Sequence, residues 1–225
     1  MEEYQINRKT MARLLRSLKG ELHETPRSIL QNQIQKGLPE FLLRFERKKP
    51  KQPFGLSTND IVSLGNLCEL TSLKSTSVQN WIKRDVKEVI GSPELGKKYS
   101  IEQAALLLVV RDLKATLDFE AIRHLLSFVF NTLSDRSDDL LSPLFFYEQY
   151  ALALDHLKDV KIIHFSEPSL EAKIDEIVNY NLEQITILTS KEKMTIRHII
   201  SITVLSVLSS HIQRKALIYY NCYFK

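Results

Sequence analysis

The sequence predicts a mainly α-helical protein, and its composition carries this prediction. The 225 residues include only 6 glycines and 7 prolines, which is about half of average usage. A β-sandwich or barrel needs many tight turns, so this shortage favours long helices. The hydrophobic share of 44% is ample for a core and speaks against disorder. The length fits one domain of ordinary size or two small ones.

Residues 1–55 are expected to form a helical extension that ends in a basic linker. Leu14, Leu15 and Leu18 follow helical spacing, and Thr25–Pro26 offers an N-cap followed by proline at the first helical position. Two prolines stop any helix at the densest basic run, whose members are Arg44, Arg47, Lys48, Lys49 and Lys51. We place a linker at about 46–56, which is either a solvated tether or an arm that contacts a nucleic-acid backbone.

Charge is spread unevenly along the chain, whose formal net charge is +4. Residues 1–56 hold 12 Lys and Arg against 6 Asp and Glu, residues 57–130 hold 9 against 9, and residues 131–225 hold 10 against 12. Binding to a polyanion depends on local charge density and not on the total. Residues 74–98 are locally basic, with six Lys and Arg against three Asp and Glu.

Residues 56–85 are expected to form two short helices joined by a turn. Ser57 begins a capped first helix, and Thr71–Lys74 forms the turn. In the second helix, Val78, Trp81 and Ile82 have the i, i+3, i+4 spacing of a buried stripe. This leaves hydroxyls, amides and cations on the outer face, namely Ser75, Thr76, Gln79, Asn80, Lys83 and Arg84. These groups can read base edges and phosphates in a DNA major groove.

The next segment is expected to form a small β hairpin. The Gly91-Ser92-Pro93 run and Gly96 offer turn chemistry between two short β-prone ends. Such a hairpin would project Lys97 and Lys98 toward a sugar–phosphate backbone. A long apolar helix over 101–116, opened by a capping box of Ser100 with Gln103, and a short helix capped by Asp118 then complete the window 56–130.

These residues carry a resemblance to a known class of protein. The string Val-Gln-Asn-Trp-Ile-Lys-Arg (78–84), followed by Gly-Lys-Lys-Tyr-Ser (96–100), resembles the winged helix-turn-helix of MerR-type regulators. More closely, it is similar to an uncharacterised bacterial family of unknown function that bears a MerR-like head. The resemblance implies a DNA-binding domain over 56–130 with a small β wing. The DNA-binding residues that it implies, together with the outer face, are Ser75, Thr76, Ser77, Gln79, Asn80, Lys83, Arg84, Lys97, Lys98 and Tyr99.

Residues 131–225 are expected to form a helical bundle that dimerises or senses a ligand. Ser142 before Pro143 is expected to cap the first helix, and a second helix is expected to begin at Pro168. Thr189 and Glu192 are expected to form a capping box at the start of the last helix. The second has an apolar stripe of Leu170, Ile174, Ile177, Ile185 and Leu188. The helix over 190–215 is apolar on nearly all sides, as expected for a bundle centre or dimer seam.

Catalytic and metal sites are not expected. No nucleophile elbow, zinc-protease motif or glycine-rich phosphate loop is present. Asp155 and Asp159 share a helix face, but a solvated surface explains them better than a metal. Two groups of aromatic residues could line a small-molecule pocket, but their helical spacing favours a core: Phe145, Phe146, Tyr147 and Tyr150, and near the end of the chain Tyr219, Tyr220, Tyr223 and Phe224. We therefore expect a non-enzyme without cofactor or metal, located in the cytoplasm and without a membrane span.

The function expected from the sequence is DNA-binding transcriptional regulation. The expected partners are double-stranded DNA, a second copy of the chain in a homodimer, and an effector whose identity is unknown. Two alternatives stay open: a non-catalytic protein-interaction module, and a ligand-binding helical protein without DNA function.

Overall fold

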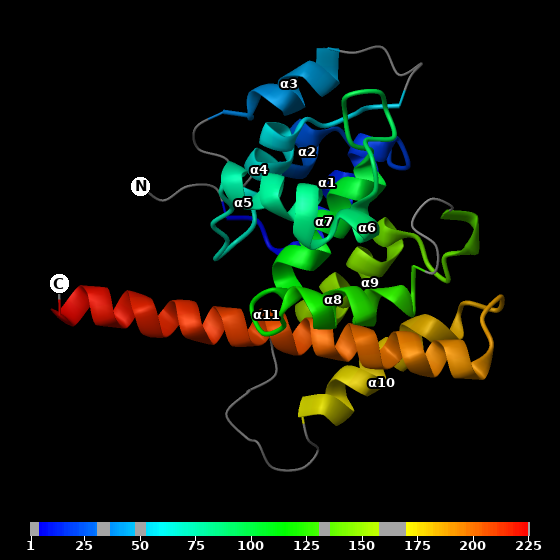
Figure 1. The fold of residues 1–225 in the computed structure, drawn as a ribbon. Helices are drawn as coiled ribbons and strands as arrows, with labels where there is room; N and C mark the ends of the chain where they lie inside the picture. Colours follow the sequence, from blue (N-terminus) through cyan, green and yellow to red (C-terminus); the bar gives the residue numbers. More distant parts are fainter. Residues whose placement is uncertain (1–4, 31–36, 48–52, 131–135, 158–169, 225) are drawn as a thin grey trace.

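The computed structural model describes residues 5–30, 37–47, 53–130, 136–157 and 170–224, and helices dominate all of these ranges (Figure 1). The helices, in chain order, are α1 (Arg8–Lys19), α2 (Pro26–Leu30), α3 (Glu40–Arg47), α4 (Thr58–Asn66), α5 (Ser75–Asn80), the π-helical turn η1 (Trp81–Asp85), α6 (Lys87–Ile90), α7 (Ile101–Leu113), α8 (Phe119–Ser127), the 3₁₀ turn η2 (Arg136–Asp138), α9 (Pro143–His156), α10 (Leu170–Glu183) and α11 (Ser190–Phe224). The mainly α class is confirmed.

Side-chain caps begin most of these helices where the sequence predicts them. Ser57 and Asp60 form a reciprocal capping box at α4, and Ser100 and Gln103 form another at α7. Asp118 caps α8, accepting a hydrogen bond from the Ala121 amide. The remaining predicted caps are also present, at Thr25, Ser142 and Thr189. These caps satisfy amides that the first turn of a helix leaves unpaired, so they fix the helix starts locally.

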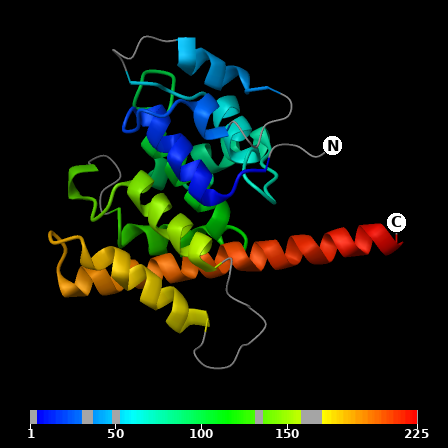
Figure 2. The same cartoon turned by 180° about the vertical axis from the view of Figure 1, so that it is seen from behind.

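The core is built around α7. Every residue from Ala104 to Val110 in α7 is buried, so this helix has no solvent face, and it packs against α1, α6, α9 and α11. A helix that is apolar on all sides belongs at the centre of a bundle. Seen from behind, α1 lies along α9 in front of the central helix (Figure 2). The aromatic side chains of Phe146, Tyr147 and Tyr150 on α9 are fully buried, as the helical spacing predicts. The prediction of a core is wrong for Tyr219, Tyr220 and Tyr223, which are exposed on the part of α11 beyond the core.

A charged cluster is buried where α1, α7 and α9 meet. The Asp112 carboxylate accepts hydrogen bonds from Arg8 Nε and Nη2, at 2.9 Å each, and from Arg111 at 2.8 and 2.9 Å. Tyr150 donates its hydroxyl to the same carboxylate at 2.9 Å. Burial alone would raise the pKa of Asp112, but the guanidinium groups of Arg111 and Arg8 hold that pKa far below its usual range. The cluster therefore stays ionised and joins three helices.

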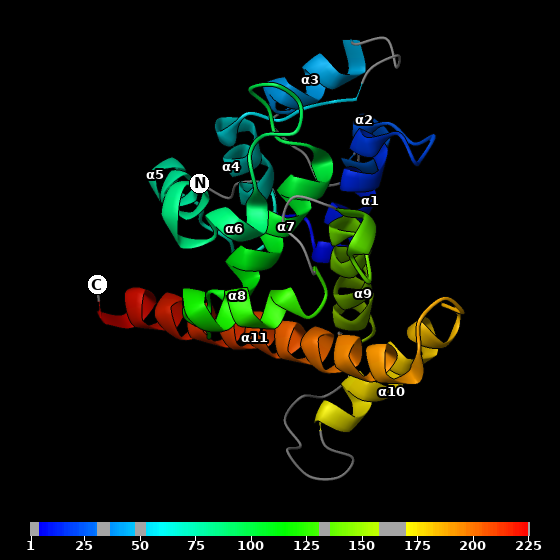
Figure 3. The same cartoon turned by 45° about the vertical axis from the view of Figure 1, so that its right-hand side comes forward.

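The C-terminal part contains α10 and the long helix α11. The predicted stripe from Leu170 to Leu188 does not lie on one helix, because α10 ends at Glu183 and Ile185 and Leu188 fall in the following turn. Pro168 lies outside the described residues. Helix α11 packs on α7, α9 and α10 along its first half and then extends past the rest of the protein (Figures 1 and 3).

Helix α11 is also the one described helix that is long and apolar enough to cross a membrane by length and composition. The candidate span, Ser190–Tyr223, has a mean hydropathy of 1.3 over its most apolar window, and 44% of that window is buried inside the protein. A core helix of a soluble protein meets the same criteria, so this observation is weak evidence for a membrane span.

The loop over 91–99 corrects the prediction of a β wing. No described residue forms a β-strand, and the loop holds only two isolated bridges, Leu56 with Tyr99 and Leu95 with Lys98. The Gln103 side chain explains why, because it donates to the carbonyls of Ile90 and Ser92 and accepts from the Glu94 amide. These backbone groups are bound to α7 and are unavailable to a partner strand. The resulting structure is an anchored loop.

Candidate nucleic-acid interface

The turn between α4 and α5 is held rigidly by Asn66. Its side-chain amide donates to the Leu73 carbonyl at 3.1 Å, and its side-chain oxygen accepts from the Leu73 amide at 2.6 Å. Gly65 allows the turn to pack closely, since a Cβ there would lie 2.4 Å from Leu73 Cδ1. Leu70 takes a left-handed conformation with φ 57°, which reverses the chain. The two helices are thus held in a fixed relation.

Helix α5 continues into the π-helical turn η1. The Val86 amide donates to the Trp81 carbonyl at 2.9 Å, five residues back, so the turn contains one residue more than an α-helical turn. Val78 is buried and Trp81 is half-buried against the edge of Phe119, with ring centroids 6.1 Å apart. These contacts fix the inner side of the segment and leave its other side toward solvent.

The exposed side of this segment is polar and basic. We define the α5 face as the exposed side chains of Thr76, Gln79, Asn80, Lys83, Arg84 and Lys87. The exposed carboxylate Glu88 follows Lys87 on α6. Ser75 and Ser77 are half-buried, and the Ser75 hydroxyl donates to Asn59 of α4. The α5 face combines the two amide side chains with three cations within about three turns, as expected from the spacing.

In the part of the chain that the structure describes, the cations of the α5 face have no carboxylate partner. Within the described residues, no salt bridge is formed by Lys83, Arg84 or Lys87. The same holds for Lys97 and Lys98 in the anchored loop, whose side chains are exposed. Unpaired cations on an exposed surface attract phosphate without first breaking an internal ion pair.

Tyr99 does not share this exposed surface. Its side chain is only 8% exposed, and its backbone pairs in both directions with Leu56, at 2.9 Å each. Burial raises the pKa of its hydroxyl. Tyr99 is therefore part of the core beneath the loop, and it is not included in the interface that we describe.

The basic extension of the chain has a different electrostatic character. Each described Lys and Arg before residue 48 forms a salt bridge with a carboxylate, and these residues are Arg8, Lys9, Arg13, Arg16, Lys19, Arg27, Arg44 and Arg47. Arg44 binds Asp60 of the α4 capping box at 2.7 Å. Lys48, Lys49 and Lys51 of the predicted linker lie outside the described residues. The described cations of the extension are therefore paired, and the role of the linker stays a prediction.

Comparison with known proteins identifies the family. The family described as "Domain of unknown function (DUF1836)" matches residues 38–150, half of the chain. This chain belongs to the DUF1836 family. The chain is also similar to the uncharacterised protein YkrK of Bacillus subtilis (strain 168). The two are 50% identical over 230 residues, which cover 96% of this chain and 97% of that protein. No solved structure matches the chain at a significant level.

The resemblance to MerR-type regulators is wrong. The matching family is DUF1836, and the described residues contain no strand from which a wing could be built. The motif strings that carried the resemblance describe local features, a short amphipathic helix and a Lys-Lys-Tyr-Ser run, which do not specify the β hairpin of that class. The family is described as a domain of unknown function, and the structure of this chain is mainly α-helical.

Several polar residues that the sequence did not single out also come together. Arg8, Glu69 and His211 line a cavity between α1, α9 and α11. They are separated by up to 203 residues along the chain, so no local motif connects them. The one available signal was Asp112, a charged residue inside the apolar run of α7, which requires a buried partner. The described residues contain no group of three side chains suited to a metal.

Proposed function

We propose that this DUF1836 protein binds double-stranded DNA through the α5 face and regulates transcription. The carrying observation is the set of exposed cations on η1 and α6, Lys83, Arg84 and Lys87, which form no salt bridge within the described chain. Gln79 and Asn80 lie among these cations, and their amides can form paired hydrogen bonds with adenine in a major groove. Lys83, Arg84 and Lys87 supply phosphate contacts that fix the helix on the duplex.

The anchored loop would add contacts to the same duplex. Lys97 and Lys98 are exposed residues of the anchored loop, which Gln103 binds to α7. The core therefore fixes the backbone position of both lysines. A rigidly placed cation loses less conformational entropy on binding than one on a free tail. We assign these two lysines to the sugar–phosphate backbone and assign no base contact to them.

Charge reversal tests this proposal. We expect Lys83→Glu/Arg84→Glu to abolish binding to a duplex measured by fluorescence anisotropy at low salt, because two phosphate contacts become repulsive. The matched control is Lys191→Glu/Lys193→Glu at the start of α11, which makes the same charge change at a distance from α5 (Figure 1). Equal loss in both variants, or no binding by the native chain at low salt, contradicts the proposal.

We propose further that the protein is a homodimer paired through the exposed end of α11. Beyond the core this helix presents apolar side chains to solvent: Ile212, Leu217, Ile218, Tyr219, Tyr220 and Tyr223. These side chains lie on several sides of the helix, and a two-fold axis would bring two copies of this apolar end of α11 together. It would also set two α5 faces on one duplex, which strengthens binding by effective concentration.

The oligomeric state tests the dimer. Sedimentation at tens of micromolar protein should give a dimer for the native chain and a monomer for Leu217→Glu/Ile218→Glu. The control is Ile187→Glu. Ile187 is 88% exposed in the turn before α11 and lies outside the apolar end of that helix. A native monomer, or a variant that remains dimeric, overturns this pairing.

We also propose a non-catalytic protein in the cytoplasm, without a membrane span. The buried half of α11 includes the polar residues Thr203 and Ser206, and the latter hydroxyl lies within hydrogen-bond distance of Thr116. Such contacts suit a helix that packs on protein. Recovery of the chain in the membrane fraction of lysed cells would contradict this location.

A further inference from the structure

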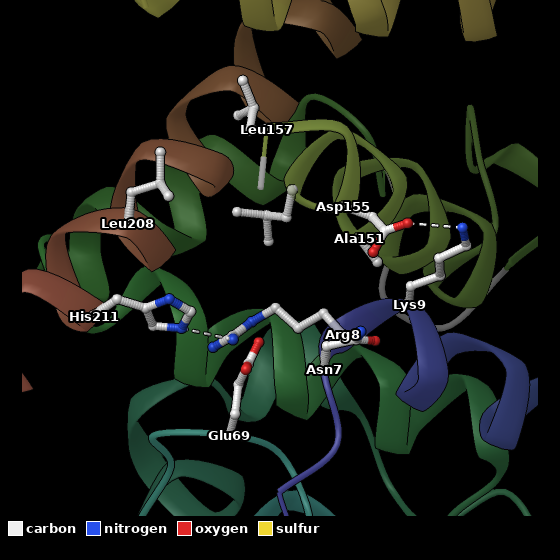
Figure 4. A pocket seen from close by; sticks show the side chains of 10 residues that line it. Asn7, Arg8, Lys9, Glu69, Ala151, Asp155, Leu157, Leu208 and His211 are labelled. Atoms are coloured by element: carbon white, nitrogen blue, oxygen red, sulfur yellow. Dashed lines mark hydrogen bonds and ion pairs between the residues drawn. The ribbon is translucent and has the colours of Figure 1, made fainter. Parts of the chain in front are cut away.

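A cavity of about 200 Å³ lies between α1, α9 and α11, with the turn after α4 at its edge (Figure 4). Its wall on α9 and α11 is apolar and includes Leu154, Leu157 and Leu208. Charged side chains complete it: Arg8 and Lys9 from α1, Glu69 from the turn after α4, and Asp155 from α9. The volume is below the range of about 300–1,000 Å³ of pockets for drug-sized molecules. The space therefore suits a compact ligand of few heavy atoms.

One end of the cavity carries excess positive charge. Arg8 and Arg111 share the single Asp112 carboxylate, so the buried cluster has two cations and one anion. The remaining guanidinium nitrogen of Arg8, Nη1, lies 3.0 Å from His211 Nε2 at the cavity wall. Burial, and next the charge of Arg8, lower the pKa of His211 to about 4, so the ring is neutral and serves as the acceptor. A neutral imidazole is a weaker partner for guanidinium than a carboxylate.

The opposite charge comes from Glu69. Its carboxylate points into the cavity from the side of the α4–α5 turn (Figure 4), and it forms no salt bridge with any described residue. The other two charged residues that line the cavity, Lys9 and Asp155, form a salt bridge with each other at 2.7 Å. Glu69, which has no salt bridge among the described residues, thus shares a small cavity with Arg8, whose Nη1 has only the neutral His211 ring as its partner.

We infer that this cavity binds a free aliphatic α-amino acid. The ligand carboxylate would accept from Arg8 Nη1 beside His211, the ammonium group would donate to Glu69, and the side chain would pack on the leucines of α9 and α11. A simple carboxylate would leave Glu69 facing an added negative charge, and a simple amine would add a cation beside Arg8. A zwitterion satisfies both charges in one ligand.

The position of the cavity links it to the α4–α5 turn. Ile6, two residues before Arg8, donates its amide to the Leu67 carbonyl at 2.8 Å and accepts from the Glu69 amide at 2.9 Å. A ligand held between Arg8 and Glu69 would bridge two segments that are already paired, which stabilises the folded state. This site does not rest on DNA binding and is tested without DNA.

Thermal unfolding of the full chain with defined probes tests the inference. L-leucine, L-isoleucine and L-valine are compared with isovalerate, which lacks the ammonium group, and isoamylamine, which lacks the carboxylate. We expect the amino acids alone to raise the Tm, by roughly 5–10 °C at about 100 times Kd. If no amino acid raises the Tm, or if isovalerate raises it as much as valine does, the inference is overturned.

Two variants place the binding in this cavity. Glu69→Gln should weaken leucine binding, measured by isothermal titration calorimetry, by about tenfold or more, because a charge-assisted hydrogen bond becomes neutral. Glu171→Gln on α10, an exposed residue, makes the same charge change elsewhere and should have no effect. Leu208→Trp should block binding by filling the cavity. Circular dichroism verifies that each variant is folded, and unchanged leucine affinity in both cavity variants contradicts the assignment.

Discussion

The extension and the α5 face both carry basic side chains but use them differently. On α1, Arg13, Arg16 and Lys19 are paired with glutamates, and Arg8 is paired inside the core. On the α5 face, Lys83 and Arg84 have no carboxylate partner in the described chain. Paired cations hold helices to one another, whereas unpaired cations remain available to an external anion. Local pairing, and not the net charge of a segment, therefore distinguishes a structural basic region from a binding region.

The largest expected effect on stability is at Asp112, the buried partner of Arg8 and Arg111. Asp112→Asn removes the one carboxylate that compensates Arg8 and Arg111, so we expect it to lower the free energy of unfolding by about 3–5 kcal/mol. Urea unfolding followed by circular dichroism measures the change. Glu24→Gln, which removes a partner of exposed Arg13, is the comparison and should cost less than about 1 kcal/mol. Equal effects at the two sites would contradict the structural role of burial.

A smaller effect is expected where the core positions the basic loop. Gln103→Ala deprives the Ile90 and Ser92 carbonyls and the Glu94 amide of their partners, so it should lower the free energy of unfolding by about 1–3 kcal/mol. Faster amide hydrogen exchange over 91–99 should accompany this loss. Unchanged exchange in the loop would show that Gln103 does not hold it.

The pH dependence of stability should report His211. Its pKa of about 4 in the folded state lies below the unfolded value of 6.5, so the unfolded chain binds more protons between these values, and stability decreases as pH falls from about 6.5 to about 4. Because the ring is partly exposed, we discount the loss to about 1–2 kcal/mol. His211→Gln keeps an acceptor for Arg8 and should flatten the curve in this window. A native curve that is already flat would contradict the assignment.

The sequence predicted the helical class and most helix starts because these depend on local chemistry. Ser57, Ser100 and Asp118 act on amides three residues away, so their role is visible in the sequence. The central helix was not predicted: a bundle centre or dimer seam was expected at 190–215, whereas the structure places α7 at the centre of the core. Prediction failed where long-range contacts decide the result, because Gln103 captures a loop that local turn chemistry would make a hairpin.

The candidate sites show the same division. The exposed face of α5 followed from the buried spacing of Val78 and its neighbours, which is a local property. The salt bridges of the basic extension could not be predicted from local spacing, because partners such as Glu102 and Glu148 come from helices that are distant in the sequence. The cavity was not predictable either, since Arg8 and Asp112 are 104 residues apart and meet only after folding.

The central claim is that unpaired cations bind DNA and paired ones do not. The most direct measurement is duplex binding by fluorescence anisotropy over a salt series for the native chain, Lys83→Gln/Arg84→Gln and Arg13→Gln/Lys19→Gln. We predict that the slope of log K against log salt becomes shallower by about 2 for the α5 variant, and stays unchanged for the α1 variant. Equal slopes in all three proteins, or a larger change in the α1 variant, would contradict the account.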